Sequence, residues 1–273
     1  MNYTSLRSAG TARFVRAFAL LVAVAMLAGC GSIGQLRKAQ TAFSQAAALD
    51  NAAQLATKSA TNYSDAAGQV TAAVSRESAK GLYWEALSYL TNFDASAEGT
   101  LRQANLWGTK LTVEAMCYWK LGLYTEAQER AQQAKENATN LTMFSRDRAL
   151  LMALPGLVKI DYSYDLIPAR RTAGTDPKFS QVKDLLVDPR YGAIKNIQNA
   201  FDMLPPHHPL APYLINSALA AFRNLQEASF RMNGGASLTP PDLDKVNEWL
   251  KKLAAEPGHE EMIKTWKGAF GIL

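Results

Sequence analysis

The sequence Gly81-Leu82-Tyr83-Trp84-Glu85-Ala86 returns 41 residues later as Gly122-Leu123-Tyr124-Thr125-Glu126-Ala127, with five of the six positions identical. Self-similarity at a spacing of this size is typical of proteins built from stacked helical hairpins. No segment of the chain shows the alternating apolar pattern of a β-strand. The repeated stretch therefore predicts an all-α body.

The second copy lies in a fuller pattern of small and aromatic residues. The positions that carry this pattern are Ala115, Tyr118, Gly122, Tyr124, Ala127 and Ala134. Over residues 108–141 their spacing resembles the tetratricopeptide (TPR) family of helical hairpins. The resemblance implies that Ala115 and Ala127 lie where two helices cross closely, and that Gly122 takes a positive φ in the turn. Glu114 stands where the family usually has Leu, and Thr139 where it often has Pro, so this repeat is divergent.

Two weaker copies extend the pattern toward the N-terminus. Residues 65–92 contain the same turn motif, although the spacing of 41 residues exceeds the family's usual 34 or so. The segment Ala39-x-x-x-Phe43-x-x-Ala46 resembles the second helix of a further repeat. The fold class that we predict is a TPR-like helical-hairpin array, either an α-solenoid or an irregular helical bundle.

The predicted organisation has five parts. They are a signal peptide (1–29), a tether (30–35), a TPR-like helical region (36–161), a loop-rich connector (162–190) and a C-terminal helical region (191–273). In the last part we expect helices over 191–203, 211–232, 241–255 and 259–269. The pair Pro155-Gly156 is expected to break or kink the helix that contains it, and Asn233-Gly234-Gly235 to close the helix that precedes it.

The first 30 residues resemble the signal of a bacterial lipoprotein. Residues 1–16 are basic, Ala17–Ala28 form an apolar run, and Leu27-Ala28-Gly29-Cys30 looks like a lipobox. Twelve apolar residues reach about 18 Å as a helix, short of a hydrocarbon core of about 30 Å, which suits a signal peptide. The resemblance implies that the Cys30 thiol receives a diacylglyceryl group, that cleavage occurs before Cys30, and that the new amine is acylated, with palmitate as the expected chain.

The same resemblance predicts a location. In lipoproteins of bacteria with two membranes, an Asp after the lipidated cysteine commonly retains the protein at the inner membrane, whereas this chain has Gly31. We therefore expect the outer membrane, with the body facing the periplasm. The net charge of +5 falls to +2 once residues 1–29 are set aside, because they carry three arginines and no acid. This balance argues against a nucleic-acid partner.

Few residues stand out as candidates for chemistry. If Cys30 is lipidated, Cys117 has no partner cysteine; we interpret it as a small buried hydrophobe, with a catalytic thiol as the alternative. His207-His208 lacks the spacing of a helical zinc site, so we expect a solvated loop and no metal. His259-Glu260-Glu261 is expected to open the last helix. Neither a phosphate-binding loop nor a nucleophile elbow is present, and we expect no cofactor.

Two pairs of residues are candidate contacts for a partner. Arg170 and Arg171, in the predicted connector, could meet an anion such as a phosphate headgroup or an acidic protein, or could simply belong to a solvated basic loop. Trp84 and Trp107 belong to an aromatic-rich zone, and either could lie in the core or line a groove that holds a peptide or apolar ligand.

Three functions fit these features. We expect a non-catalytic lipoprotein that acts as a TPR-like adaptor and holds a protein or peptide partner near the membrane. One alternative resembles the TPR lipoproteins that accompany TRAP-type uptake systems, and would hold a small ligand in an enclosed cavity. The other is a cell-wall enzyme such as a helical lytic transglycosylase, which requires a buried glutamic acid in a saccharide groove. No Glu is marked out by a motif.

Overall fold

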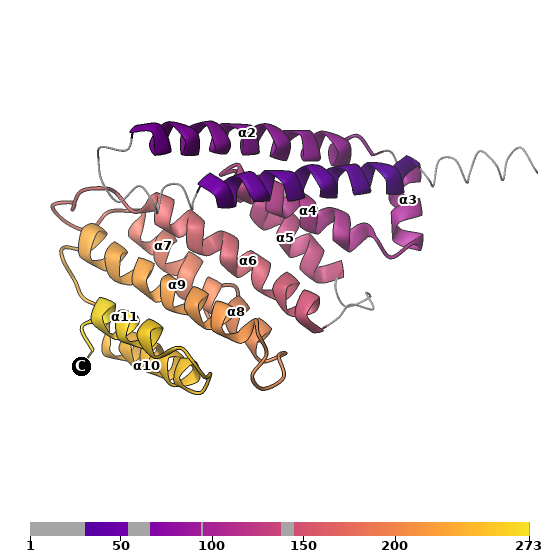
Figure 1. The fold of residues 1–273 in the computed structure, drawn as a ribbon. Coiled ribbons are helices and arrows are strands. Elements are labelled where there is room, and N and C mark those ends of the chain that lie inside the picture. The colour runs from indigo at the N-terminus through magenta and orange to yellow at the C-terminus, as the bar shows by residue number, and fades with distance from the viewer. Residues whose placement is uncertain (1–30, 54–65, 94, 138–144, 273) are drawn as a thin grey trace, which may run out of the picture. The chain divides into compact units, whose positions relative to one another are not determined.

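The computed structural model describes residues 31–53, 66–93, 95–137 and 145–272. These residues are built from α-helices and their connections and contain no β-strand, which confirms the all-α prediction for this part of the chain (Figure 1). Residues 31–53 are helical, and the helices that follow are α2 (Ala66–Thr91), α3 (Ala95–Gln103), α4 (Trp107–Lys120), α5 (Tyr124–Asn137), α6 (Ser145–Leu166), α7 (Phe179–Val187), α8 (Ala193–Phe201), α9 (Ala211–Met232), α10 (Pro240–Ala254) and α11 (Glu260–Phe270).

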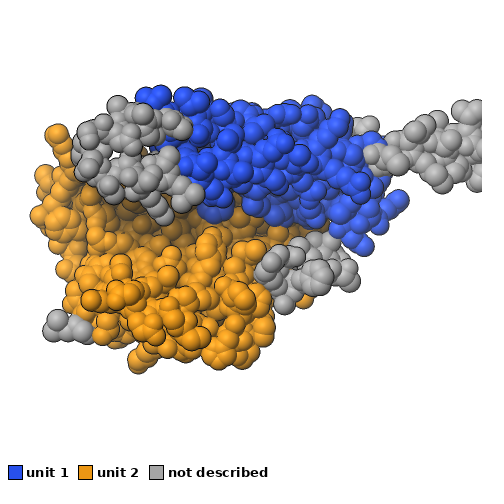
Figure 2. All heavy atoms as spheres, in the orientation of Figure 1, with its two compact units in different colours: residues 1–121 blue, residues 122–273 orange. Residues whose placement is uncertain are grey.

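The chain divides into two compact units, residues 1–121 and residues 122–273 (Figure 2). The division lies between α4 and α5, whereas the sequence analysis expected a connector at 162–190. That segment belongs entirely to the second unit, where it contains the end of α6 and the whole of α7. Among the described helices, none is long and apolar enough to cross a bilayer.

The first unit has a core made by the helix over 31–53 together with α2, α3 and α4. Leu36, Ala39 and Ala46 recur at helical spacing and are buried, with Phe43 packed against the same cluster. The helix expected over 39–46 is therefore present, with its small residues in the core. The Tyr83 ring lies 5.5 Å from that of Phe43. Residues 31–35, which we assigned to a tether, are part of this helix instead.

The two copies of the repeated hexapeptide have different structures. Gly122 has a φ of 77° in the turn after α4, as predicted. Gly81 lies inside the 26-residue helix α2, so the expectation of a turn there is wrong. A helical glycine costs about 1 kcal/mol relative to alanine. Burial of Tyr83 and other residues of α2 favours the uninterrupted helix over a turn.

Helix α4 contains a buried ion pair at the position where the sequence departs from the TPR pattern. The Lys110 Nζ lies 2.6 Å from Glu114 Oε1, and the two side chains are 8% and 2% exposed. The Lys110 Nζ also lies 4.8 Å from the centre of the Trp107 ring. Glu114, where a TPR repeat usually has Leu, therefore carries a charge that Lys110 compensates inside the protein.

The second unit is organised around α6, which packs against α5, α7, α8 and α9. The helix continues through Pro155, so the predicted break is absent, although the missing N–H of proline removes one backbone hydrogen bond. Packing against α8 favours the unbroken helix, and Gly156 makes this packing possible. A Cβ at this position would lie 2.8 Å from the Ala193 carbonyl oxygen and 3.0 Å from Asn196 Cβ. The glycine therefore allows α6 and α8 to approach closely.

Replacing Gly156 by alanine is expected to destabilise the protein by about 1–3 kcal/mol, because the added methyl group must push α8 away. Gly268→Ala is the matched control, since a Cβ at Gly268 in α11 meets open space and alanine favours the helix by up to about 1 kcal/mol. Chemical denaturation of both variants measures the difference. Equal stability of the two variants would show that the approach of α6 to α8 is not tight.

The C-terminal helices follow the sequence prediction closely. Helix α9 covers the predicted residues 211–232, and it ends before Gly234 and Gly235, which take φ values of 65° and 88°. Helix α11 begins at Glu260 with His259 at its N-cap and two glutamates in the first turn. Helix α10 packs against α9 and α11. The Trp266 indole N–H donates to Asn216 Oδ1 at 2.9 Å, which ties α11 to α9.

Candidate functional site

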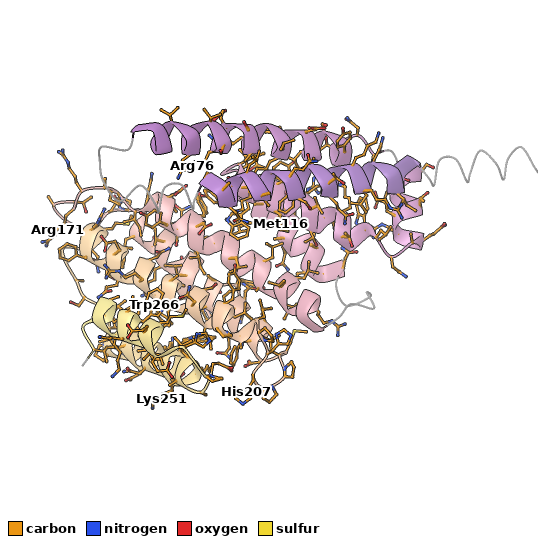
Figure 3. The ribbon with its side chains drawn as sticks, in the orientation of Figure 1. Arg76, Met116, Arg171, His207, Lys251 and Trp266 are labelled. Carbon is orange, nitrogen blue, oxygen red and sulfur yellow. The ribbon has the colours of Figure 1, made fainter. Side chains whose placement is uncertain are left out.

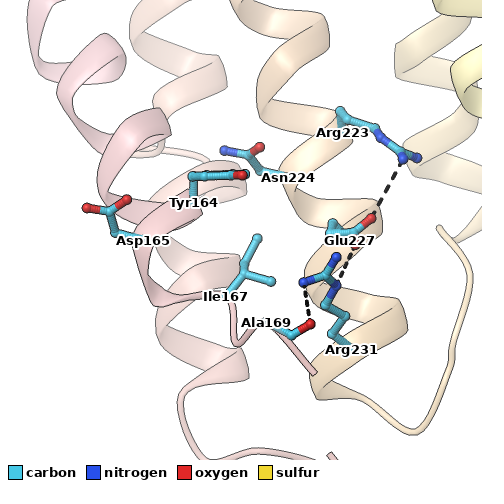
Figure 4. A pocket seen from close by; sticks show the side chains of 8 residues that line it. All are labelled: Tyr164, Asp165, Ile167, Ala169, Arg223, Asn224, Glu227 and Arg231. Carbon is cyan, nitrogen blue, oxygen red and sulfur yellow. Dashed lines mark hydrogen bonds and ion pairs between the residues drawn. The ribbon is translucent and has the colours of Figure 1, made fainter. Parts of the chain in front are cut away.

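A recess of about 460 Å³ lies between the end of α6, the residues that follow it, and one face of α9 (Figure 4). It combines charged, amide and aromatic side chains, which single it out as the candidate site. Its lining residues are Tyr164 and Asp165 of α6, Ile167 and Ala169 after it, and Arg223, Asn224, Glu227 and Arg231 of α9.

The charged side of the recess is a helical stripe on α9. Arg223, Glu227 and Arg231 are four residues apart, so their side chains share one face of the helix. The Arg231 Nε lies 2.5 Å from Glu227 Oε1, and the Arg223 Nη2 lies 3.7 Å from Glu227 Oε2. Figure 4 shows Glu227 between the two arginines. The opposite face of α9, with Leu214, Ile215 and Phe222, is fully buried.

The residues after α6 are fastened to the end of α9. The Arg231 Nη1 donates to the carbonyl oxygens of Pro168 at 2.9 Å and Ala169 at 3.0 Å. In return, the Thr172 N–H donates to the Arg231 carbonyl at 2.8 Å, and the Asp176 N–H to the Met232 carbonyl at 2.7 Å. The last carbonyls of a helix have no partner within the helix. The loop therefore caps α9, and this capping fixes one wall of the recess.

Asn224 closes the recess toward α6. Its Nδ2 donates to the Ile160 carbonyl at 2.9 Å and contacts Ser163 Oγ at 3.1 Å. Ser163 is itself buried and donates to the Ile160 carbonyl. These contacts join the last turns of α6 to the middle of α9. The position of Tyr164 relative to the arginine stripe follows from them.

The Asp165 carboxylate is engaged on the other side of α6. The Tyr124 hydroxyl donates to Asp165 Oδ2 at 2.9 Å, and the Tyr124 ring stacks on Tyr162 with their centres 5.2 Å apart. Burial first, and then the hydrogen bond to Asp165, raise the pKa of Tyr124 above its ordinary value. In Figure 4 Asp165 points away from α9. Asp165 thus supports the packing of α5 on α6.

The recess is suited to noncovalent binding of a polar ligand. The two arginines contact Glu227, while the Asp165 carboxylate accepts a hydrogen bond from the Tyr124 hydroxyl on the other side of α6. The Tyr164 side chain is 65% exposed at the edge and offers an aromatic surface. An exposed aromatic ring beside amide and guanidinium donors is the kind of surface that contacts a peptide segment.

The predicted anion contact lies outside this recess. The Arg171 guanidinium donates to the Gly234 carbonyl and lies 5.4 Å from the centre of the Phe230 ring, at the end of α9 (Figure 3). Arg170 is exposed in the same loop. Arg171 therefore helps to hold the loop on α9, with its charge near the helix C-terminus. An anion contact at these two arginines stays a prediction.

The two candidate groove tryptophans belong to the first unit. Trp84 is 54% exposed on α2. Trp107 is partly buried. Two cations lie near the centre of its ring, the Arg102 guanidinium at 4.9 Å and the Lys110 Nζ at 4.8 Å. Neither residue lines the recess on α9. Cys30 lies outside the described residues, so its lipidation stays a prediction.

The histidine pair has no metal-binding geometry among the described residues. His207 has a φ of 56° in the loop between α8 and α9 (Figure 3), and its Nδ1 lies 3.4 Å from Glu256 Oε2. The His208 Nδ1 accepts the Leu210 N–H. Throughout the described ranges, no three His, Cys, Asp or Glu side chains lie close enough to share a metal ion.

Cys117 is buried in the core of the first unit. Burial first, and then the Glu114 carboxylate, raise the pKa of the thiol from its ordinary 9.0 to about 12. This shift is opposite to the one that activates a nucleophilic cysteine. The prediction that Cys117 is buried is therefore confirmed. The low reactivity of its thiol stays a prediction.

At pH 8 we expect Cys117 to resist thiol reagents, because its thiolate fraction is about a thousandfold below that of a thiol with a pKa near 9. Labelling with a chromogenic disulfide in buffer and in denaturant measures the contrast. Because the folded-state pKa is the higher one, this thiol also stabilises the fold less as pH rises above 9. Rapid labelling of the folded Cys30→Ser variant at pH 8, in which Cys117 is the remaining thiol, would contradict the burial of Cys117.

Sequence reasoning missed the arginine stripe that forms the site. The pattern Arg223-x-x-x-Glu227-x-x-x-Arg231 was the available signal, since it places three alternating charges on one helical face. No family model, curated protein or solved structure matches this chain.

Proposed function

We propose that this chain is a lipid-anchored protein of the bacterial outer membrane that faces the periplasm and holds a protein or peptide partner without catalysing a reaction. The observation that carries the anchor is the sequence Leu27-Ala28-Gly29-Cys30 after a short apolar run. The feature that supports partner binding is the recess on α9, with its exposed Tyr164.

A divergent TPR-like repeat over residues 108–141 is part of this proposal. Two 14-residue helices, α4 and α5, flank a turn in which Gly122 has a positive φ. The small residues at the family's crossing positions, Ala115, Ala127 and Ala134, are fully buried. The positive φ of Gly122 and the burial of these three alanines support the repeat resemblance over this stretch.

The polarity of the recess on α9 favours the adaptor function over that of an uptake accessory. The accessory requires an enclosed apolar cavity, whereas five of the eight residues that line the recess on α9 are charged or carry a side-chain amide. A surface of this polarity resembles the rim of a protein interface more than a pocket for an apolar solute.

Site-specific photo-crosslinking tests the adaptor function. A photoreactive phenylalanine replaces Tyr164 in one variant and Tyr191 in the other, since these two tyrosines are 65% and 66% exposed in the same unit. After irradiation of intact cells, we expect a discrete protein adduct from position 164 and none of that mass from position 191. Identical adducts from both positions, or lipid adducts alone, would refute partner binding at the recess.

A further inference from the structure

The described residues begin at Gly31, the residue that follows the proposed lipid anchor, and they are helical from there. Gly31 is already helical, and the helix continues without interruption to residue 53. The Cα atoms of consecutive residues are about 3.8 Å apart. If Cys30 carries the acyl chains, no flexible segment separates this helix from the bilayer surface. The geometry of the first unit then determines which of its residues meet the lipid headgroups.

The contacts between two helices show which part of the unit lies beside residue 31. The Lys38 Nζ lies 5.8 Å from the centre of the Tyr89 ring, and farther along the Tyr83 hydroxyl donates to Asp50 Oδ2 at 2.9 Å. Residues later in the helix over 31–53 therefore contact residues earlier in α2, so the two helices run antiparallel (Figure 1). Consequently, the start of the helix over 31–53 lies at the end of α2.

The same end of the first unit carries α3 and the turn that follows it. The Lys110 Nζ lies 5.9 Å from the centre of the Phe93 ring and 4.8 Å from that of the Trp107 ring, which joins the segment that follows α2 to the start of α4, and Figure 1 shows α3 beside the start of the helix over 31–53. Residues 102–105, which are the end of α3 and the turn after it, are exposed, and Asn105 takes a φ of 57°. The Arg102 guanidinium lies 4.9 Å from the centre of the Trp107 ring. We call the group Phe93, Arg102–Asn105 and Trp107 the anchor end.

The chemistry of the anchor end fits a phospholipid surface. Tryptophan favours the headgroup level of a bilayer, because its ring is apolar and its N–H is polar. Arginine can lay its apolar stem along such a ring while its charge stays among phosphates. Between residues 93 and 107 the charged residues are Asp94, Glu98 and Arg102, and the last two form an ion pair of 2.7 Å, so contact with lipid depends on the tryptophan ring and the arginine stem and not on net charge.

We propose that the anchor end rests on phospholipid headgroups and that the helix over 31–53 points away from the bilayer. This inference rests on the proposed lipidation of Cys30. At 1.5 Å per residue, the far end of the helix then stands roughly 30 Å above the attachment point. The partner of this surface is the lipid bilayer itself.

Fluorescent labelling of the full-length lipidated protein tests the inference. Gln103→Cys places an environment-sensitive dye in the anchor end, and Asn51→Cys places the same dye near the other end of the helix; both positions are exposed. Cys117 is buried and has a raised pKa, so the dye reacts at the introduced cysteine. The proteins are inserted into vesicles of phosphatidylethanolamine and phosphatidylglycerol that carry a headgroup-level quencher.

We expect the dye at position 103 to be quenched and shifted to shorter wavelength, and the dye at position 51 to be unaffected. Vesicle-bound protein with position 103 unquenched would refute contact at the anchor end while leaving the lipid anchor intact. Quenching at both positions would show that the helix lies along the surface, and would refute the upright orientation. Failure of purified protein to bind vesicles at all would instead overturn the lipid anchor and this inference together.

Discussion

Cys30→Ser is expected to abolish stable attachment to the membrane. Serine has no thiol to accept the diacylglyceryl group, so the signal is left unprocessed or the body is released. Each acyl chain contributes about 0.8 kcal/mol per buried CH₂, and several chains make attachment nearly permanent. We therefore expect the wild-type protein in the pelleted membranes, and a large loss of mature lipidated protein from that fraction in the variant. Membrane fractionation with intact-mass spectrometry measures both properties.

Cys117→Ala is the matched control for this experiment, because it removes the other cysteine of the chain from a buried position. We expect this variant to keep its lipid mass and its membrane attachment, even if the smaller side chain lowers its stability. An unmodified, full-length wild-type polypeptide in the cytosol would contradict the anchor outright. Mature Cys30→Ser protein that remains tightly bound to the membrane would contradict it as well.

Local sequence was sufficient to predict the C-terminal helices. Helix α9 begins with Pro212 in its first turn and ends at Asn233-Gly234-Gly235, where positive φ values stop the helix. Helix α11 begins at the expected acidic turn. These boundaries depend on residues within a few positions of the helix end. The sequence therefore contains the information that determines them.

The same kind of local signal failed where packing between distant residues determines the structure. The Gly122 and Gly81 hexapeptides are nearly identical, yet only Gly122 lies in a turn. Pro155-Gly156 has the composition of a helix break, but Gly156 lets α6 approach the Ala193 carbonyl of α8. A single sequence does not show that α8 occupies this position. The gain from packing outweighs the local cost in both helices.

The candidate site could be predicted only in part. The charged stripe on α9 follows from its four-residue spacing, although it was not identified in advance. The other walls of the recess come from residues about 60 positions earlier, which Arg231 and Asn224 hold by hydrogen bonds. For the loop that contains Arg170 and Arg171 the sequence left open an anion contact or a solvated basic loop, and in the structure the residues that follow these arginines cap α9. This role became visible only when the two segments were seen together.

Lys110→Met is expected to lower the free energy of unfolding of the first unit by about 3–5 kcal/mol. The substitution removes the ammonium that lies 2.6 Å from Glu114 Oε1, and the carboxylate loses this partner while 2% exposed. A buried charge without its counter-ion keeps its desolvation cost and loses the attraction that offset it. The free energy of unfolding from urea titration, compared with that of the wild type, measures the effect.

The double variant Lys110→Met, Glu114→Leu separates the cost of an isolated charge from the loss of packing. It should recover most of the stability, because two apolar side chains of similar size fill the space and no buried charge is left. Leu is also the residue that the TPR family usually has at the position of Glu114. Lys80→Met is the exposed control in the same unit: the Lys80–Glu77 pair is 56% and 78% exposed, and breaking it should change stability by at most about 0.5 kcal/mol. If Lys110→Met were as mild as Lys80→Met, the ion pair in α4 would have to be open to water, and the burial of Glu114 would be refuted.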